Sequence, residues 1–436
     1  MRSKSLISLA LLLAIALSLT IHPTVTAQSK PSGTITVWMW KSNWDNLTNS
    51  GILDDFKKEF PDITVNRVDI PASDVYQKLP IAISAGTGAP DVSLVEDSAL
   101  GRFVALGGLA DLTEWSKPYR DQIVEYKWAQ ASKDGKVYGM PWDFGPVVTY
   151  YRRDIFKAAG FSDDPAEVSK LVATWDEYLK TCKTIKEETK LLCFPISKAN
   201  NDGRFYEEML WQQGLGYVSA DGKVTVDSPE NIATLEKLGE FVKADVIADQ
   251  QSWTDTWYAL FNKKDEGVAS TVMAAWMGGF MRTWLALDTK GLWGVTLMPA
   301  MKEGQPRAAN DGGSDFIIPE QSQNKEAAWA FVEYMLARPK SQVKIFGATD
   351  IFPALKETYS DPIFKEADPY FGGQKVREVY TEVAGKIPSA TVYGEHYQEI
   401  NRFVSTAIQK YLTGSMSAAD ALKEAASQVR QQTGLQ

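Results

Sequence analysis

Aromatic and acidic side chains follow two of the strands that the first third of the chain predicts. Trp40, Lys41 and Trp44 lie in a polar loop at the end of the first strand, and Glu96 and Asp97 follow the third. Ligands of open α/β sheets bind beyond the carboxyl ends of the strands. Indole rings suit the apolar face of a pyranose, and carboxylates pair with its hydroxyls. The alternatives are core packing for each tryptophan and, for the acids, charges at a helix N-terminus.

Four further segments place aromatic, acidic or glycine residues beside predicted strands or turns. The first of them, residues 139–144, precedes a predicted strand over 146–151. Three of them contain a Gly-Gly pair, and glycine lets the backbone approach a ligand closely. A Gly-Gly turn by itself indicates little, because many such turns are plain loops. The candidate ligand contacts in these segments are Trp142, Asp143, Trp276, Asp311, Gly312, Gly313, Phe371 and Gln374.

The chain offers few residues for hydrolytic, metal or nucleotide chemistry. Its histidines are His22 and His396, and it has no Gly-x-Ser-x-Gly sequence for a hydrolase nucleophile. The glycine-rich residues 86–90 lack the Lys-Ser/Thr of a P-loop and the third glycine of a dinucleotide-binding sequence. We therefore predict no catalytic residue, no metal site and no cofactor.

Length and charge narrow the classes of protein further. With 436 residues the chain predicts two or three domains with sizeable cores. The 46 Lys and Arg residues against 55 Asp and Glu residues give a net charge of −9, and the longest basic run is the pair Arg152-Arg153. Nucleic acid is therefore not an expected partner, since its binding needs a basic surface.

The first 27 residues are typical of a secretory leader. Arg2 and Lys4 precede an apolar stretch over residues 6–21, and small residues allow cleavage after Ala27. The alternative is an uncleaved N-terminal anchor, because the stretch approaches the length of a spanning helix. With no cysteine near the cleavage site, a lipid anchor is not expected there. We predict an exported protein, on the periplasmic or extracellular side of the membrane.

Export bears on the two cysteines of the chain. Cys182 and Cys193 would enter an oxidising compartment, in which disulfides persist. A bridge between them would close a loop of 12 residues. We favour the bridge, and the alternative is a pair of buried free thiols.

The pattern of apolar residues predicts an α/β fold. Apolar strands over residues 34–40, 63–70 and 91–95 alternate with helices, an order typical of a doubly wound parallel sheet. After residue 150 helical patterns dominate, interrupted by a predicted hairpin over 217–226. The predicted helices of this part are 175–188, 205–213, 229–244, 324–336 and 418–429.

Ordered segments along the chain give a resemblance to a known family. They are the first strand with Trp40, residues 86–91, 112–113, 135–142, 150–156 and 174–177, then Trp276, and residues 312–314, 325–329 and 371–374. Through them, from about residue 33 to 428, the chain resembles the family 1 extracellular solute-binding proteins, the maltose-binding-protein-like receptors of ABC carbohydrate importers.

This resemblance implies a two-lobed fold, each lobe a mostly parallel sheet flanked by helices, with a ligand cleft between the lobes. One lobe would comprise residues 28–143 plus 311–352, and the other 144–310 plus 353–436. The chain would cross between them three times, near 143–147, 304–313 and 351–354. The strand-end loops and the crossing segments would supply the ligand contacts.

The function implied is that of a monomeric, non-catalytic receptor that captures an oligosaccharide and delivers it to the permease subunits of an ABC importer. A secreted glycoside hydrolase is one alternative, because its two carboxylates could come from any of the many acidic residues. The other alternative is the same fold with a non-sugar solute. Few arginines lie in the strand-end loops, which argues against a strongly anionic ligand.

Overall fold

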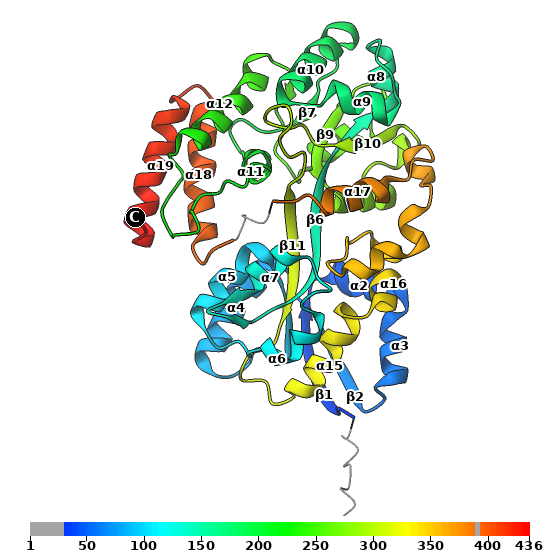
Figure 1. The fold of residues 1–436 in the computed structure, drawn as a ribbon, viewed down its shortest axis with the longest axis vertical. Helices are drawn as coiled ribbons and strands as arrows, with labels where there is room; N and C mark the ends of the chain where they lie inside the picture. The colour runs from blue at the N-terminus through cyan, green and yellow to red at the C-terminus, as the bar shows by residue number, and fades with distance from the viewer. Residues whose placement is uncertain (1–29, 389–392) are drawn as a thin grey trace, which may run out of the picture. The chain divides into compact units, whose positions relative to one another are not determined.

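The structure is a computed structural model that describes residues 30–388 and 393–436 (Figure 1). The predicted leader, residues 1–27, lies outside the described residues. Residues Ser32–Gln436 form one unit in which strands alternate with helices.

The first three strands form the parallel sheet that the sequence predicts. The strands β1 (Gly33–Met39), β2 (Ile63–Asp69) and β3 (Val92–Glu96) pair in parallel, with β1 in the middle. The side chains of β3 are almost entirely buried, as expected for a strand covered on both faces. The helices of this region are α2 (Lys41–Ser50), α3 (Ile52–Glu59), α4 (Ala72–Ala85) and α5 (Asp97–Leu106). In Figure 1, α4 and α5 lie on one side of this sheet and α2 and α3 on the other.

Two long strands continue the sheet into the rest of the unit. The strands β6 (Met140–Arg152) and β11 (Asn310–Ile317) are antiparallel to each other, and β11 is antiparallel to β3. Beyond them, β9 (Ser270–Ala274) and β10 (Trp293–Leu297) both pair antiparallel with β6. The sheet order is β10-β6-β11-β3-β1-β2, with β9 also on β6. The half with β1, β2, β3 and β11 is thus mostly parallel with one reversed strand, whereas β6 pairs antiparallel with both β9 and β10. The predicted α/β fold class is confirmed.

Short strands and helices complete the unit. The other strands are β4 (Ser132–Lys133), β5 (Lys136–Val137), β7 (Phe194–Pro195) and β8 (Ile247–Ala248). The α-helices are α6 (Thr113–Ser116), α7 (Glu125–Ala131), α8 (Arg153–Ala158), α9 (Pro165–Leu171), α10 (Trp175–Thr189), α11 (Arg204–Trp211), α12 (Pro229–Lys243), α13 (Asp255–Asn262), α14 (Trp276–Phe280), α15 (Lys325–Leu336), α16 (Pro339–Thr349), α17 (Val376–Ala384), α18 (Tyr397–Leu412) and α19 (Ala418–Thr433). The remaining turns are the π-helix η2 (Met281–Leu285) and the 3₁₀ helices η1 (Lys117–Tyr119), η3 (Leu287–Thr289), η4 (Lys356–Ser360), η5 (Pro362–Lys365) and η6 (Pro369–Phe371).

A disulfide fixes one helix of the later part. Cys182 on α10 is bonded to Cys193, just before β7, with a Cα–Cα distance of 5.3 Å. Both side chains are fully buried. The predicted bridge is confirmed, and the alternative of two free thiols is wrong.

Three local predictions differ from the structure. The loop expected over residues 40–44 is the first turn of α2, which begins at Lys41 because the Trp44 N–H bonds back to the Trp40 carbonyl. Residues 140–145 belong to β6, paired with β11, and do not form a loop before it. The hairpin over 217–226 is reduced to one antiparallel bridge, Val218 to Val224.

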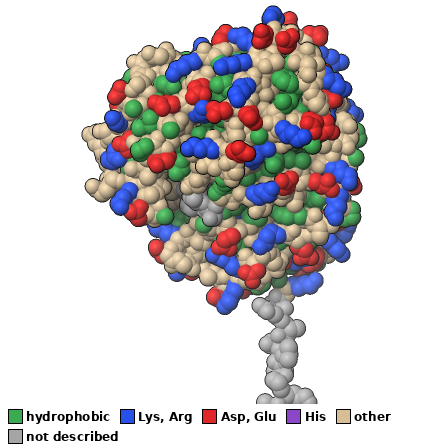
Figure 2. Space-filling view, turned by 45° about the horizontal axis from the view of Figure 1, so that its top comes forward, with side chains coloured by type: hydrophobic (Ala, Val, Ile, Leu, Met, Phe, Trp, Pro, Cys, Tyr) green, Lys and Arg blue, Asp and Glu red, His purple; other side chains and the backbone are tan. Residues whose placement is uncertain are grey.

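The surface carries both signs of charge. On the face that Figure 2 shows, Lys and Arg side chains are interspersed with Asp and Glu side chains. Within the part of the chain that the structure describes, no helix is both long and apolar enough to span a bilayer.

Candidate ligand-binding cavity

A cavity of about 530 Å³ opens beside the central strands β6 and β11. This volume falls within the roughly 300–1,000 Å³ of small-molecule sites. The lining comes from the start of α2, the β3–α5 junction, both central strands, α11, α14 and the start of α18. The lining residues are Trp40, Ser42, Asn43, Asn46, Glu96, Ser98, Asp143, Asp202, Arg204, Glu207, Trp211, Trp253, Trp276, Phe280, Asp311, Gly312, Gly313, Ser314, Thr349, Ile351, Tyr393, Tyr397 and Asn401.

Aromatic rings from two sides of the fold face this cavity. The Trp276 ring lies 5.8 Å from the Trp253 ring and 5.5 Å from the Phe280 ring, centroid to centroid. Trp40 contributes a further indole from the end of β1. Half-buried rings of this kind present apolar faces to a ligand while their own packing holds them in place.

An arginine lies over the aromatic wall. The Arg204 guanidinium lies 5.8 Å from the ring centroid of Trp253 and 5.9 Å from that of Trp276, and donates a hydrogen bond to the Asp311 carboxylate. The indole N–H of Trp276 donates to the Asp311 carbonyl at 3.0 Å. These contacts fix Arg204 and Trp276 to β11, so the donors of Arg204 are positioned before any ligand arrives.

A buried carboxylate occupies another part of the lining. Oε1 of Glu207 accepts hydrogen bonds from the hydroxyls of Tyr217 (2.9 Å) and Tyr397 (2.8 Å) and from the Asn401 amide (2.8 Å). Burial raises the pKa of Glu207 to about 7, although these three hydrogen bonds lower it. The group therefore changes charge near neutral pH. Its hydrogen bonds with Tyr397 and Asn401 join α11 to α18.

The floor of the cavity contains a buried ionic cluster. The Ser314 hydroxyl donates to Asp143 at 2.6 Å, and burial raises the pKa of Asp143 to about 6, against the lowering effect of Lys127. Lys127 is itself fully buried and paired with Asp97. Gly313 has φ +123°, and a Cβ there would lie 2.5 Å from Oδ2 of Asp97. Only glycine fits this turn of β11 above the cluster.

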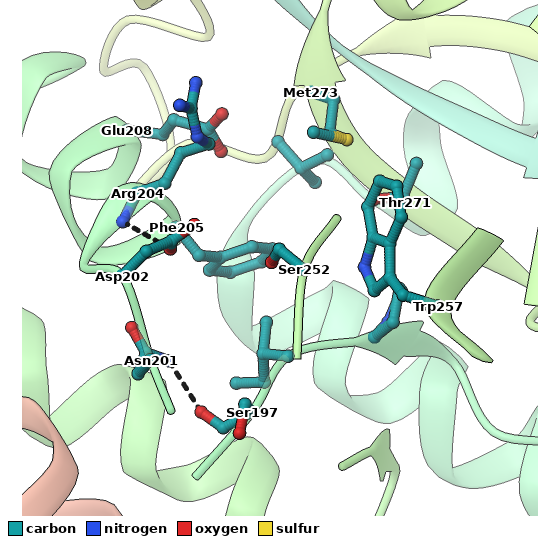
Figure 3. Close-up of a pocket in the computed structure, with 13 residues that line it drawn as sticks. Ser197, Asn201, Asp202, Arg204, Phe205, Glu208, Ser252, Trp257, Thr271 and Met273 are labelled. Atoms are coloured by element: carbon teal, nitrogen blue, oxygen red, sulfur yellow. Dashed lines mark hydrogen bonds between the residues drawn. The ribbon is translucent and has the colours of Figure 1, made fainter. Parts of the chain in front are cut away.

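A second, smaller cavity of about 30 Å³ adjoins the first, with Asp202 and Arg204 lining both. Figure 3 shows Trp257 and Thr271 on one side of it and Asp202 and Glu208 on the other. Among the described residues, neither carboxylate oxygen of Glu208 has a hydrogen-bond partner, and burial raises the pKa of this group well above its usual range. The space suffices for a water molecule or a small polar group.

The structure brings seven of the predicted contacts to the large cavity. They are Trp40, Glu96, Asp143, Trp276, Asp311, Gly312 and Gly313. Successive residues of a strand point to opposite faces, so neighbouring candidates can lie in different surroundings. Asp143 faces the cavity, while Trp142 points to the other side of β6, against Phe316. Their role as ligand contacts stays a prediction.

The other six predicted contacts lie outside the lining. Trp44 is 1% exposed, with its indole N–H on the Val68 carbonyl, and Lys41 is exposed and paired with Asp45. The remaining ones are Trp142 and Phe371, both buried in the core, Asp97, buried against Lys127, and Gln374, whose amide bonds the backbone of Val295 on β10. We do not carry these six into the proposed site.

Several lining residues were missed from the sequence. Arg204 and Glu207 lie on α11, and Tyr397 and Asn401 on α18, two helices that come together only through tertiary packing. Trp253 lies in the loop before α13 with φ +66°. A tryptophan within the polar residues 249–256 is the sequence signal that could have marked it.

Within the described residues, no group of three or more His, Cys, Asp or Glu side chains is arranged to hold a metal ion.

Comparison with known proteins gives relatives along most of the chain. It is 28% identical over 323 residues to the arabinooligosaccharide-binding protein of Bacillus subtilis, covering 72% of each chain. It is 27% identical over 391 residues to the lactose-binding protein of Rhizobium radiobacter, covering 88% of this chain and 89% of that one.

Solved structures share the two-lobed fold. The ABC transporter associated binding protein from B. animalis subsp. lactis, in complex with beta-1,6-galactobiose, matches with a TM-score of 0.74 at 24% identity, over 92% of this chain and 97% of that one. The family model described as bacterial extracellular solute-binding protein matches residues 43–340, more than half of the sequence. The chain therefore belongs to the bacterial extracellular solute-binding proteins.

Proposed function

We propose that this protein is an exported receptor that captures a neutral oligosaccharide in the large cavity and delivers it to an ABC importer. The observation that carries the proposal is the lining itself: indole rings stand beside hydrogen-bonding groups already held by the fold. Such a surface suits a ligand with apolar ring faces and many hydroxyls. The curated relatives that bind arabinooligosaccharides and lactose support the same ligand class.

The charges of the cavity favour a neutral ligand over an anionic one. Among the described residues, its lining has one arginine, Arg204, and five acids: Glu96, Asp143, Asp202, Glu207 and Asp311. Arg204 is already paired with Asp311, so it is not free to hold a phosphate or carboxylate as a fork. Burial raises the pKa values of Asp143 and Glu207 to about 6 and about 7, which lessens the negative charge that the ligand meets.

The cavity also favours binding without cleavage. A glycosidase needs one carboxylic acid and one carboxylate on either side of the scissile bond. Here Glu207 accepts three hydrogen bonds, Asp311 is paired with Arg204, and Asp143 is bonded to Ser314. The other two acids also accept hydrogen bonds, Glu96 from the Ser98 hydroxyl (3.4 Å) and Asp202 from the Arg204 backbone N–H (3.2 Å). Carboxylates held in this way position other side chains and hydroxyls. We propose release of the sugar intact to permease subunits, from a monomeric receptor that closes about its β6 and β11 segments.

A thermal-shift screen of the purified chain against neutral mono- and oligosaccharides tests the proposal. A sugar at 100 times its Kd should stabilise the folded state by about 2.7 kcal/mol and raise the melting temperature. Peptides and sugar phosphates serve as comparison ligands. A panel in which only these comparison ligands raise the melting temperature would contradict the sugar assignment.

A further inference from the structure

A continuous strip of aromatic rings leads from the cavity wall to the protein surface. We define the aromatic strip as Trp253, Trp276, Phe280, Trp284 and Tyr258. Successive ring centroids are 5.8 Å apart from Trp253 to Trp276, 5.5 Å from Trp276 to Phe280, 5.6 Å from Phe280 to Trp284 and 5.2 Å from Trp284 to Tyr258. The first three rings line the cavity, whereas Trp284 and Tyr258 lie outside its lining. Tyr258 also contacts the buried Trp257 (5.6 Å), which lies 5.2 Å from Trp253, so Trp284 is the ring of the strip farthest from the cavity wall along these contacts.

Two tryptophans of the strip, one lining the cavity and one beyond it, are exposed to an unusual degree. Trp284 is 49% exposed and Trp253 is 38% exposed. Together with Ile81, Leu106 and Leu287 they are the exposed large hydrophobic side chains of the described residues. Single exposed apolar residues are common, but a contiguous aromatic surface joined to a cavity marks a binding surface.

The strip is built on a rigid support. Trp276 and Phe280 lie on α14, and Trp284 lies on the π-helix η2 that follows it directly. Behind the rings, a Cβ at Gly278 would lie 2.7 Å from the Tyr380 hydroxyl, so glycine is what lets α14 pack this closely. Single π-helical turns within helices occur frequently at functional sites.

An ion-pair network holds η2 from its other side. Arg282 bonds the carboxylates of Asp350 and Asp368 (2.8 Å to the latter), and Asp350 also bonds Arg377 at 3.0 Å. The Ala286 N–H bonds the Met281 carbonyl at 3.2 Å and closes the wide turn. The platform for the rings is therefore fixed before any ligand binds, which lowers the entropic cost of stacking on it.

We infer that the aromatic strip is a binding surface for sugar units that extend beyond the cavity, so that the ligand is a chain with one end outside. The inference rests on the proposed function. Its basis is continuity: Trp276 and Phe280 belong both to the cavity and to the strip, and the Phe280 ring contacts the exposed Trp284 ring at 5.6 Å. A sugar chain that leaves the cavity past Phe280 would meet Trp284 next.

The test measures affinity as a function of ligand length. Linear arabino-, galacto- and malto-oligosaccharides of two to six units are titrated calorimetrically into the full exported chain and into Trp284→Ala. Trp284 is exposed, so its removal leaves the core intact. Within the series that binds, we expect Kd to fall with length in the unmodified protein. Trp284→Ala should weaken the longest chains about threefold to tenfold and leave the shortest unchanged.

Trp115→Ala is the matched control, because the Trp115 ring stacks on Trp329 at 5.6 Å and lies outside the cavity lining. It should leave Kd unchanged at every length. Short sugars that bind with no gain from added units, or equal Kd values for Trp284→Ala and the unmodified protein at all lengths, would overturn the inference while leaving the proposed function intact. Absence of binding by sugars of every length would overturn both.

Discussion

Replacing Trp276 with alanine should separate ligand binding from folding stability. The Trp276 ring is half-buried, lies against two other rings of the cavity wall and donates its N–H to the Asp311 carbonyl. If a sugar ring stacks on it, its loss should cost on the order of 2–4 kcal/mol of binding, as for an aromatic hot spot. At about 1.4 kcal/mol per tenfold, Kd would rise roughly 30-fold to 1,000-fold.

Trp276→Ala should reduce the folding stability by less than it reduces the free energy of ligand binding. One hydrogen bond contributes about 1 kcal/mol, and the ring leaves space that is open to the cavity, so no closed void remains in the core. We expect a stability loss of about 1–2 kcal/mol for Trp276→Ala. By contrast, Trp293→Ala removes a fully buried ring and should cost about 3–5 kcal/mol with little change in Kd.

Calorimetric titration and a melting curve on the same variants check both quantities. Trp276→Phe is the conservative control, because it keeps a ring and removes only the N–H donated to Asp311. We expect it to retain most of the affinity. An unchanged Kd for Trp276→Ala together with a large drop in melting temperature would refute the placement of this ring against the ligand.

Three further changes test the rest of the structure. Burial raises the pKa of Glu207 from 4.5 to about 7, so between these pH values the folded state holds a proton that the unfolded state has released. The free energy of unfolding should therefore fall by up to about 3 kcal/mol as pH rises from 4.5 to about 7. The melting temperature should change less with pH in Glu207→Gln than in the unmodified protein. The same change with pH in both proteins would count against the raised pKa. Denatured protein without reductant should show no free thiol, and reduction should lower the stability by about 2–3 kcal/mol; two titratable thiols would contradict the bridge. Gly313→Ala should lower the stability by on the order of 3 kcal/mol, because its Cβ would lie 2.5 Å from Asp97. Gly304 also has a positive φ but open space around it, so Gly304→Ala should lower the stability by about 1 kcal/mol. Equal losses of stability would show that crowding is not the cause.

The sheet could be predicted from the sequence because its strands leave a local signature. β1 and β3 are rich in apolar and β-branched residues, and α10 begins where Thr174 caps its N-terminus. The disulfide was favoured from export and spacing, and the two cysteines are bonded. The long strand β6 was only half predicted, because Pro141 and Gly145 interrupt the pattern of a central strand.

The cavity could be predicted only in part. Whether a tryptophan lies in the core or at the cavity depends on its exact place in the local structure: Trp40 precedes α2 and lines the cavity, whereas Trp44, one turn into the helix, is buried. The Glu207 cluster joins residues nearly 200 positions apart. No local pattern marks such a pairing, because it exists only once α11 and α18 pack together.

The most direct measurement is calorimetric titration of the exported chain with the sugar that gives the largest thermal shift, followed by mass spectrometry of the sugar recovered from the complex. A receptor with the cavity described here should bind one sugar per chain and return it with its mass unchanged. Absence of saturable binding by every neutral sugar tested, or recovery of shortened products in proportion to the protein added, would contradict a receptor that captures an oligosaccharide and releases it intact.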